Sequence, residues 1–546
     1  MAWWGWGPAQ AERALPDHAL PFLREHLDLS SAPVRPRVPL EHVRLAEPNL
    51  PRTLVDRLES ALSADRVRSD RAARVEHAAG KGYVDLVRLR AGELTGAPDA
   101  VLEPATEEEV RLVLRACHEA SVAVVPFGGG TSVVGGVEPV RGEHAAVVAL
   151  DLGRLDRLVS LDERSLTAVL EPGLRGPEAE RLLAARGLTL GHFPQSYEHA
   201  SIGGYVATRS AGQASTGYGR IDELVLGVRM LAPAGELDLA PRPASAAGPD
   251  LREVVVGSEG ALGVVTRAAL AVRPRPALTR YEGWFFRSFE EGVEALRLLE
   301  QAGAAPQVAR LSDEEETRLS FALAGEGGAA ARAGRAYLRA RRYAGGCLAI
   351  AGWEGDAASV ARRRALGGRL LRRHGGLALG AAPGRAWSRG RYAAPFLRDA
   401  LLDHGVMVET LETATQWSML AELYRAVGDA LRASLQALRT PPLVLCHVSH
   451  LYDSGASLYF TFLARQLPGE EVAQWRAAKR SATEAIVAVG GTITHHHAVG
   501  RDHADWMAAE VGETGVGLLR ALKEELDPRG IMNPGKLLPG GYFLAA

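Results

Sequence analysis

The spacing of hydrophobic residues changes along the chain between the period of a strand and that of a helix, which predicts a mixed α and β protein. The first clear unit starts after residue 96, with a short apolar strand at 100–105. Thr106 then predicts the start of a helix, because Glu109 three residues later completes a capping box. The residues expected on the buried face of this helix are Val110, Val113, Leu114 and Cys117.

Further strand patterns follow this helix and are separated by turn residues. They are the apolar segments at 122–127, 145–152, 157–162 and 166–173, and the alternating segment at 264–274, which ends at prolines. A helical pattern at about 177–186 lies between them. We therefore expect residues 97–276 to form one α+β domain.

Three other segments complete the predicted organisation. Residues 1–96 are predicted as a helical and irregular N-terminal appendage with little chemistry of its own, because prolines interrupt it. These prolines are Pro33, Pro36, Pro39, Pro48 and Pro51. Residues 277–480 are predicted as a second α+β unit, a cap that binds substrate, with an arginine-rich surface helix at 328–345.

Residues 481–546 are expected to complete the active site and to pack on the first domain. Their last helix places four leucines on one broad face and ends before Asp527 and Pro528. The four are Leu518, Leu519, Leu522 and Leu526.

Composition narrows the class of protein and its partners. Hydrophobic residues make up 47% and charged residues 23% of the chain, which is ordinary for a soluble globular protein. The formal net charge is −2, so no global field attracts nucleic acid, and we expect no nucleic-acid partner. Cys117, Cys347 and Cys446 fit no zinc or redox spacing, which favours a reducing compartment. No transmembrane run, secretory signal or peroxisomal signal is recognisable, so we expect a cytoplasmic protein.

A glycine-rich segment at 126–136, PFGGGTSVVGG, follows the strand at 122–127. Successive glycines allow consecutive backbone N–H groups to point inward and bind an anion such as a pyrophosphate. The alternative is an ordinary glycine-rich turn. The segment lacks the GxxxxGK[ST] and GxGxxG patterns, which disfavours a nucleoside-triphosphate hydrolase and a nicotinamide-binding domain.

Two further segments combine glycines with small polar side chains. Residues 194–227 alternate glycines with serine and threonine hydroxyls, and residues 257–266 place two glycines just before a strand. This density of small residues suits a backbone that lies close to a flat, polar ligand, although a series of turns would show the same composition.

In this order, the three segments resemble the FAD-binding domain of the vanillyl-alcohol-oxidase-type flavoproteins. The resemblance implies an α+β protein with a two-subdomain FAD-binding domain of that type, an α+β cap domain and the helical N-terminal appendage. It also implies FAD as a non-covalently bound cofactor, because no attachment residue is recognisable. The implied flavin contacts are Gly128, Gly129, Gly130, Thr131, Ser132, Val133, Val134, Gln195, Ser196, Tyr197, Glu198, His199, Ala200, Ser201, Thr208, Arg209, Ser210, Ala211, Glu259, Gly260, Ala261, Leu262, Gly263, Val264 and Val265.

Tyr459 lies in YDSGASLYFTF (452–462), which predicts a turn followed by a strand. Strand alternation places Leu458 and Phe460 on one face and Tyr459 on the other, pointing toward a cavity. An ordinary strand tyrosine is the alternative.

A histidine triplet, His495 to His497, follows a pair of glycines. If the triplet is extended, His496 faces one way and His495 and His497 face the other. His496 could then act as a general acid or base. The alternatives are a solvated turn or a metal site, formed by His495 with His497 or by His447 with His450.

Several motifs together resemble the alkylglycerone-phosphate synthase family across most of the chain. They are WWGWG (3–7), the three glycine-rich segments, FLRD (396–399), ETLETA (409–414), YDSGASLYF (452–460) and HHHAVG (495–500). The resemblance implies catalytic roles for Tyr459 and His496 and substrate binding by Arg398 and Arg310. We expect His495 and His497 to bind the substrate phosphate.

The resemblance implies a transferase that replaces the acyl group of acyl-dihydroxyacetone phosphate with a fatty alcohol in ether-lipid synthesis. The flavin would act as a covalent handle, without net redox change. The expected partners are these lipid substrates, a membrane surface contacted peripherally, and a second copy of the chain in a homodimer. His447 and His450 stand where the family carries Arg and Gln, and the ending LDPRGIMNPGKLLP resembles FAD-linked D-2-hydroxy-acid dehydrogenases. A dehydrogenase or oxidase of a D-2-hydroxy acid is therefore the alternative, and a non-catalytic flavin-binding protein is a third possibility.

Overall fold

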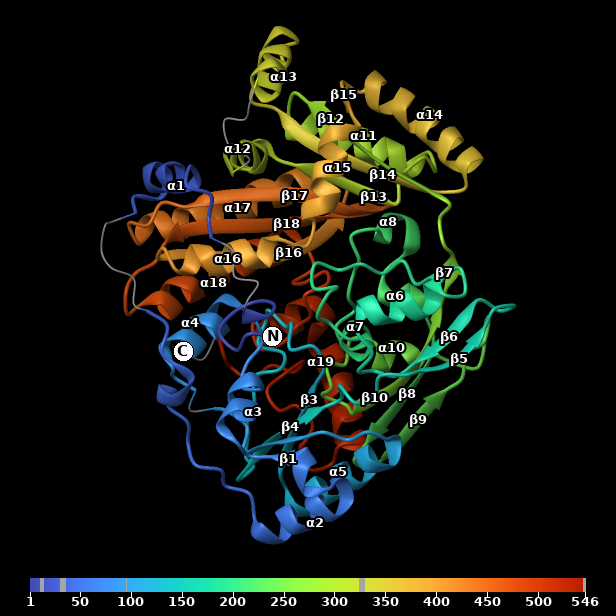
Figure 1. The fold of residues 1–546 in the computed structure, drawn as a ribbon, viewed down its shortest axis with the longest axis vertical. Helices are drawn as coiled ribbons and strands as arrows, with labels where there is room; N and C mark the ends of the chain where they lie inside the picture. The colour runs from blue at the N-terminus through green and yellow to red at the C-terminus, as the bar shows by residue number, and fades with distance from the viewer. Residues whose placement is uncertain (10–13, 30–35, 95, 324–328, 544–546) are drawn as a thin grey trace.

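The computed structural model describes residues 1–9, 14–29, 36–94, 96–323 and 329–543. A seven-stranded sheet with its helices forms the upper half of the molecule in Figure 1, and a four-stranded and a five-stranded sheet form the lower half. Pro33 and residue 328, at the start of the predicted surface helix, lie outside the described residues.

The four-stranded sheet has the order β1-β2-β4-β3. Its strands are β1 (Val67–Arg68), β2 (Ala100–Leu102), β3 (Ala123–Phe127) and β4 (Val147–Asp151). Strands β2, β4 and β3 are parallel, and β1 joins them antiparallel through the pairs Val67–Leu102 and Arg68–Val101. Because β1 precedes residue 96, the predicted boundary between the appendage and the first domain falls inside this sheet.

Helix α5 (Glu107–Ala120) begins and packs as predicted, with one difference at its cap. The Thr106 hydroxyl accepts a hydrogen bond from the Glu109 N–H at 3.1 Å. The Glu109 carboxylate accepts from the Ala105 N–H at 2.6 Å and pairs with Arg66 at 2.7 Å. The four residues predicted on the buried face of this helix are all at most 2% exposed.

The five-stranded sheet has the order β5-β6-β10-β8-β9, and a two-stranded ribbon of β11 and β7 accompanies it. The strands are β5 (Leu158–Asp162), β6 (Thr167–Leu170), β7 (Leu188–Thr189), β8 (Val225–Ala232), β9 (Gly235–Leu239), β10 (Val264–Ala271) and β11 (Arg273–Pro274). The helices of this region are α6 (Gly176–Ala184), α7 (Ile202–Ala207), α8 (Ser215–Tyr218), α9 (Ile221–Leu224) and α10 (Arg252–Val255).

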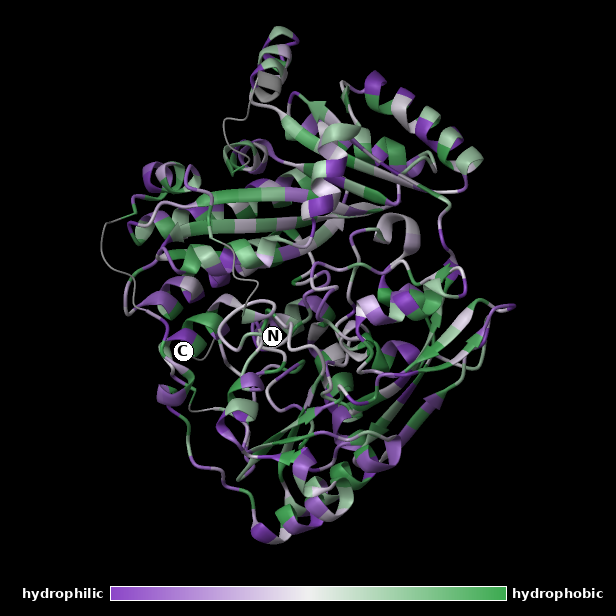
Figure 2. Cartoon of the chain, viewed as in Figure 1, coloured by the Kyte–Doolittle hydropathy of each residue, from purple (hydrophilic) through white to green (hydrophobic). Residues whose placement is uncertain are grey.

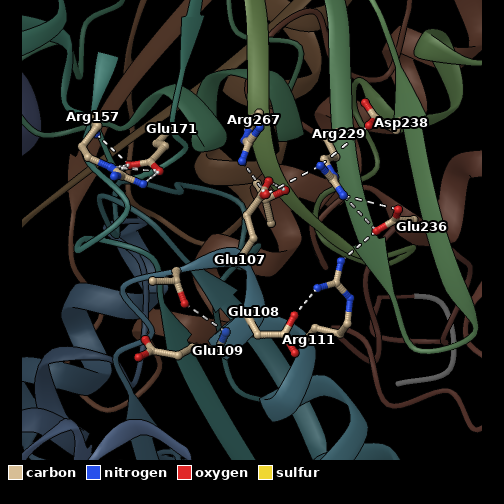
Figure 3. A network of polar contacts seen from close by, with 12 residues as sticks. Glu107, Glu108, Glu109, Arg111, Arg157, Glu171, Arg229, Glu236, Asp238 and Arg267 are labelled. Carbon is tan, nitrogen blue, oxygen red and sulfur yellow. Dashed lines mark hydrogen bonds and ion pairs between the residues drawn. The ribbon is translucent and has the colours of Figure 1, made fainter. Parts of the chain in front are cut away.

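A polar network joins the first turn of α5 to the five-stranded sheet (Figure 3). The Glu107 carboxylate accepts hydrogen bonds from Thr266 at 2.8 Å and from Arg267 at 2.7 Å, both on β10. Arg111, one turn along α5, pairs with Glu236 on β9 at 2.9 Å. These contacts hold the two lower sheets at a defined relative position, with the glycine-rich segments between them.

The seven-stranded sheet has the order β15-β12-β14-β13-β17-β18-β16. Its strands are β12 (Leu278–Phe286), β13 (Val308–Ser312), β14 (Cys347–Gly355), β15 (Leu377–Gly380), β16 (Val406–Gln416), β17 (Leu443–Tyr452) and β18 (Gly455–Arg465). The helices around it are α11 (Phe289–Gln301), α12 (Glu314–Leu323), α13 (Ala329–Ala340), α14 (Ala357–Arg373), α15 (Ala381–Gly390), α16 (Ala394–Leu402), α17 (Leu420–Ala437) and α18 (Glu471–Val489).

One face of this sheet carries the main core of the upper half. Helices α11, α14, α17 and α18 cover that face, and Phe460, Phe462 and Trp475 are at most 1% exposed within it. The central strands β17 and β18 are mostly green in Figure 2, whereas α14 at the margin carries many purple residues. The opposite face of the central strands is turned toward the lower half.

Both ends of the chain return to the middle of the molecule. The N-terminal region contains α1 (Ala19–Leu27), α2 (Arg52–Leu62), α3 (Arg71–Glu76) and α4 (Tyr83–Ala91). The Trp6 N–H donates to Asp399 at 2.5 Å, and the buried Lys81 ammonium donates to the Ala2 and Trp3 carbonyls at 2.9 and 3.1 Å. At the other end, the Val124 N–H of β3 donates to the Ile531 carbonyl at 2.8 Å.

The last helix, α19 (Met507–Leu526), ends before Asp527 as predicted, but its apolar face is narrower. Leu519, Leu522 and Leu526 pack against the cores, whereas Leu518 is 64% exposed. The backbone at Gly512 is not helical, with φ 72°, so the helix kinks there. Among the described residues, no helix combines the length and the apolar character needed to cross a bilayer.

Candidate active site

A cavity of about 520 Å³ lies between the lower sheets and the seven-stranded sheet. The glycine-rich loop after β3, the segment at 194–213 and the turn before β10 form its lower wall. Side chains of β13, β17 and β18 form its upper wall, and the loop at 496–498 lies at one side. Trp6, Leu15 and Leu23 of the N-terminal region also line it.

The structure brings most of the predicted flavin contacts to this cavity. The predicted residues that line it are Gly128, Gly129, Gly130, Thr131, Ser132, Val133, Gln195, Ser196, Ala200, Ser201, Thr208, Ser210, Ala211, Glu259, Gly260, Gly263 and Val265. The predicted residues outside its lining are Val134, Tyr197, Glu198, His199, Arg209, Ala261, Leu262 and Val264. Arg209 is turned away because it pairs with Asp222 and Glu253 at 3.2 and 2.5 Å. Side chains alternate between the two faces of a strand, so Val264, at the start of β10, points into the core beneath the cavity wall.

The glycine-rich loop fits the close approach of a polar ligand. A Cβ at Gly129 would lie 2.2 Å from the His199 carbonyl oxygen, and one at Gly128 would lie 2.3 Å from the Ser201 hydroxyl. Two backbone segments therefore meet at a spacing that only glycine permits. The neighbouring Gln195 carries a buried amide nitrogen without a partner among the described residues, which supplies a free donor. The closely approaching glycine backbone, the free donor and the cavity are together the features that a bound dinucleotide such as FAD requires.

The predicted orientation of Tyr459 is confirmed. Leu458 and Phe460 are fully buried in the core, and Tyr459 and Thr461 line the cavity. In the sheet, Tyr459 lies directly between Glu412 of β16 and His447 of β17. Burial raises the pKa of Tyr459 to about 12, so its hydroxyl is protonated at neutral pH.

The prediction that the histidine triplet alternates like a strand is wrong. The segment 495–497 is a series of bends, and its three consecutive N–H groups all converge on the Glu412 carboxylate. The N–H donors of His496 and His497 lie 3.1 and 2.7 Å from Oε1. His496 and His497 consequently both line the cavity, whereas His495 does not.

The two cavity-lining histidines lie next to each other beside the ring of Tyr459, with their own ring centroids 4.8 Å apart. The ring of His496 lies 5.9 Å from that of Tyr459 and nearly parallel to it, and the ring of His497 lies 5.4 Å away and perpendicular. Burial lowers the pKa of His496 to about 4, against an opposing effect of Glu412, and burial also lowers the pKa of His497. A neutral tyrosine hydroxyl and a neutral imidazole therefore face the same cavity at neutral pH, which is an arrangement capable of proton transfer.

Glu412 is a residue of the site that was not predicted. It lies in the ETLETA segment, where two carboxylates interrupt an apolar strand, and that interruption is the signal that could have found it. Its side chain is fully buried and also accepts from the Thr494 hydroxyl at 2.7 Å. Burial opposes its ionisation, but the adjacent imidazoles, His496 first, and the Thr494 hydroxyl hold the pKa of Glu412 well below its usual range.

The predicted arginines occupy two sides of the cavity. Arg310 on β13 donates to Nε2 of His447 at 2.9 Å and to Glu316 at 2.6 Å. Arg398 on α16 donates from Nη1 to the Lys81 carbonyl, and its Nε and Nη2 are buried without a hydrogen-bond partner among the described residues. Arg398 therefore retains free donors that suit an anion, whereas Arg310 is already engaged.

One part of the cavity is apolar. Leucines of α1, α12, α16, β17 and β18 pack together there, and they also line the cavity. They are Leu15, Leu23, Leu319, Leu323, Leu397, Leu401, Leu445 and Leu463. The cavity therefore joins a polar, histidine-rich wall to an apolar arm, which suits a ligand with a charged head and a hydrocarbon tail.

We predict that Glu412→Gln lowers the free energy of unfolding by about 3 kcal/mol, because an amide accepts hydrogen bonds less strongly than the buried carboxylate. The exposed Glu422→Gln is the control and is expected to change it by less than about 0.5 kcal/mol. Because the folded-state pKa is depressed, the stabilisation is complete above about pH 4.3 and is lost as the pH falls through the folded-state value. Urea denaturation at several pH values measures both effects, and equal stabilities of the two variants at pH 7 would contradict the assignment.

Comparison with known proteins agrees with this geometry. Residues 98–238 match the family model described as "FAD binding domain", and residues 275–537 match "FAD linked oxidases, C-terminal domain". The alkyldihydroxyacetonephosphate synthase of Dictyostelium discoideum is 34% identical over 511 residues, which cover 92% of this chain and 84% of the relative.

Two solved structures are similar to this chain, one in both sequence and fold and the other in fold. A structure of alkyldihydroxyacetonephosphate synthase matches with a TM-score of 0.85 at 30% identity, and the match covers 98% of this chain and 99% of the other. A p-cresol methylhydroxylase structure matches with a TM-score of 0.67 at 16% identity over 89% of this chain and 96% of the other, which shows the shared fold. The predicted fold and FAD as the cofactor are confirmed. The chain therefore belongs to the alkyldihydroxyacetonephosphate synthase family of FAD-dependent enzymes.

Proposed function

We propose that this enzyme exchanges the acyl group of acyl-dihydroxyacetone phosphate for a fatty alcohol and releases a fatty acid. The observation that carries the proposal is the single cavity that joins the glycine-rich loop, the Tyr459 and His496 wall and the apolar arm. The substrates of this reaction have a charged head and a long hydrocarbon tail, which are the two properties that this cavity accommodates.

Arg398 binds the carboxylate of the departing fatty acid in this proposal. Its Nε and Nη2 make no hydrogen bond to the described residues, although Nη2 lies 3.5 Å from Oδ1 of Asp399, and both can donate to a carboxylate. The neighbouring apolar arm holds the attached chain. Arg310 positions His447 against the ring of Tyr459, since its own donors are occupied by His447 and Glu316. His497 lines the cavity and remains a candidate for the substrate phosphate, whereas His495 lies outside the lining.

Tyr459 and His496 move the protons in this proposal. The tyrosine hydroxyl is a protonated donor and the His496 imidazole is an unprotonated acceptor at neutral pH. An attacking alcohol must lose its proton, and an adjacent neutral imidazole can accept it. Glu412 acts through the backbone, because it holds His496 and His497 next to each other beside the Tyr459 ring.

FAD supplies a covalent handle for the substrate carbon when bound. We infer that it is held without a covalent bond to the protein, because all three cysteines are buried outside the cavity lining and the sequence of the glycine-rich segments contains no recognisable attachment residue. Denaturation followed by filtration is then expected to release the flavin, and flavin retained with the polypeptide would contradict this inference.

We predict that Gly129→Ala lowers the affinity for FAD by about tenfold or more, because the new methyl group pushes apart two backbone segments of the flavin cradle. The control is Gly235→Ala, where a Cβ meets nothing within 4 Å. Flavin absorbance per polypeptide after gel filtration measures the occupancy. Full occupancy in Gly129→Ala would argue against this loop as the flavin site.

We predict that Tyr459→Phe and His496→Ala each lower turnover by about 10² to 10⁴-fold, because each removes one group of the proton relay. Both variants are expected to keep the flavin absorbance and the melting temperature of the wild type. Turnover is measured as the formation of labelled alkyl-dihydroxyacetone phosphate from acyl-dihydroxyacetone phosphate and a labelled fatty alcohol.

The matched controls for these variants are Tyr337→Phe on α13 and His42→Ala, which change exposed side chains and are expected to leave turnover unchanged. Unchanged turnover in His496→Ala would disprove the proton relay. Anaerobic bleaching of the flavin by D-lactate or 2-hydroxyglutarate, without exchange of the alcohol, would favour the alternative dehydrogenase.

Membrane contact and dimerisation are further proposals. We predict that the protein binds liposomes peripherally near α1 and α12, where the apolar arm lies. Phe321, 37% exposed, is on the other side of α12, where it stacks on Phe285. Phe321→Asp is expected to reduce flotation with liposomes several-fold, whereas Leu518→Asp on α19 is expected to have no effect. If both variants float with liposomes to the same extent, the membrane contact does not lie near α1 and α12. Light scattering tests the expected homodimer.

A further inference from the structure

Three imidazole rings converge beside the cavity from two separate segments of the chain. His450 lies on β17, and His495 and His496 lie in the loop after α18. The distances between ring centroids are 5.1 Å for His450–His495, 5.2 Å for His450–His496 and 5.1 Å for His495–His496. One nitrogen of each ring lies within 4.8 Å of the other two, so the rings form a nearly equilateral triangle around a common point.

A strand irregularity aims His450 at this point. The pairing of β17 with β18 shifts register between Ser449 and Leu451, which leaves His450 as the extra residue of a bulge. The backbone of His450 has φ 56°, a left-handed conformation that is unfavourable for a side chain of this size. As a result, Ser449 and His450 both line the cavity, although regular alternation would place them on opposite faces.

The outer nitrogens of two rings already have hydrogen-bond partners. Nδ1 of His450 lies 2.5 Å from the Ser215 hydroxyl, and Nε2 of His495 lies 2.6 Å from the Tyr452 hydroxyl. These contacts leave Nε2 of His450 and Nδ1 of His495 directed inward. Nδ1 of His495 is hydrogen-bonded to Nδ1 of His496 at 2.9 Å, and a bound ion would replace this hydrogen bond. A ring that is fixed through one nitrogen and presents the other is the usual environment of a metal-binding histidine.

The geometry assigns to His450, His495 and His496 a binding site for a divalent transition-metal ion of the zinc class. Three nitrogen donors suit zinc, cobalt or nickel, whereas magnesium and calcium require oxygen donors. The Glu412 carboxylate, 3.8 Å from Nδ1 of His496, supplies a nearby negative charge. Arg220, the cation closest to Tyr452, is paired with Asp222 at 3.2 Å.

The fourth coordination position of this ion faces the cavity, because His450 and His496 both line it. Three protein ligands and one open position are typical of metal sites that bind an oxygen atom of a ligand. Coordination through Nδ1 leaves Nε2 of His496 as an N–H donor, so in any one molecule zinc binding and the proton-acceptor role of His496 exclude each other. The metal site is therefore tested by binding and does not depend on the transferase assay.

The test measures zinc binding to the purified flavoprotein after removal of metal with a chelator and dialysis. One equivalent of zinc is expected to stay with the wild type after desalting, as measured by mass spectrometry of the metal. Competition with a chromophoric chelator gives the affinity. His450→Gln is expected to weaken zinc binding by more than about 100-fold, and Ser215→Ala by about 10 to 100-fold, because it removes the partner that orients His450.

His447→Gln is the matched control. This buried histidine lies on the same strand but contacts Arg310 and Glu316, so its loss is expected to leave the affinity for zinc unchanged. Flavin absorbance verifies that each variant is folded. Cobalt in place of zinc should give the visible bands of a tetrahedral site in the wild type and not in His450→Gln. No stoichiometric zinc in the wild type, or undiminished binding in a folded His450→Gln protein, would overturn the assignment.

Discussion

The Glu412 carboxylate is the contact on which the geometry of the site depends. It accepts the N–H groups of His495, His496 and His497, while its own strand pairs it directly with Tyr459. One buried charge thereby holds a loop from the C-terminal segment against a strand of the seven-stranded sheet. Without it, three backbone donors inside the protein would have no acceptor, which is costly at each position.

The parts of the site that could be predicted from the sequence are those that local periodicity controls. Tyr459 faces the cavity because side chains alternate along β18, and the start of α5 follows from Thr106 and Glu109. The glycine-rich segments could be recognised because a position where two backbones approach closely leaves no room for a side chain, and glycine is the residue that such a position requires. These features each depend on a continuous stretch of sequence.

The parts that could not be predicted depend on contacts between distant segments. The histidine triplet was expected to alternate, but a carboxylate more than 80 positions away gathers its N–H groups and bends it. Likewise, a β-bulge turns His450 toward the cavity, and the pattern of apolar residues does not predict where a bulge occurs. Trp6 was assigned to an appendage, although its backbone N–H is hydrogen-bonded to Asp399, a residue nearly 400 positions away.

The way the two ends of the chain meet in the middle has a consequence for how the protein is made. The Val124 N–H of β3 is bonded to Ile531, and the cavity is lined both by Trp6 and by His497. Pairings between positions so far apart require the closure of very long loops, which slows folding and delays them until both partners exist. On the ribosome, the edge of β3 that faces away from β4 therefore stays unpaired until nearly the whole chain is synthesised, and during that time the glycine-rich loop beside it has no completed cavity. The active site of this fold is consequently among the last parts of the molecule to form.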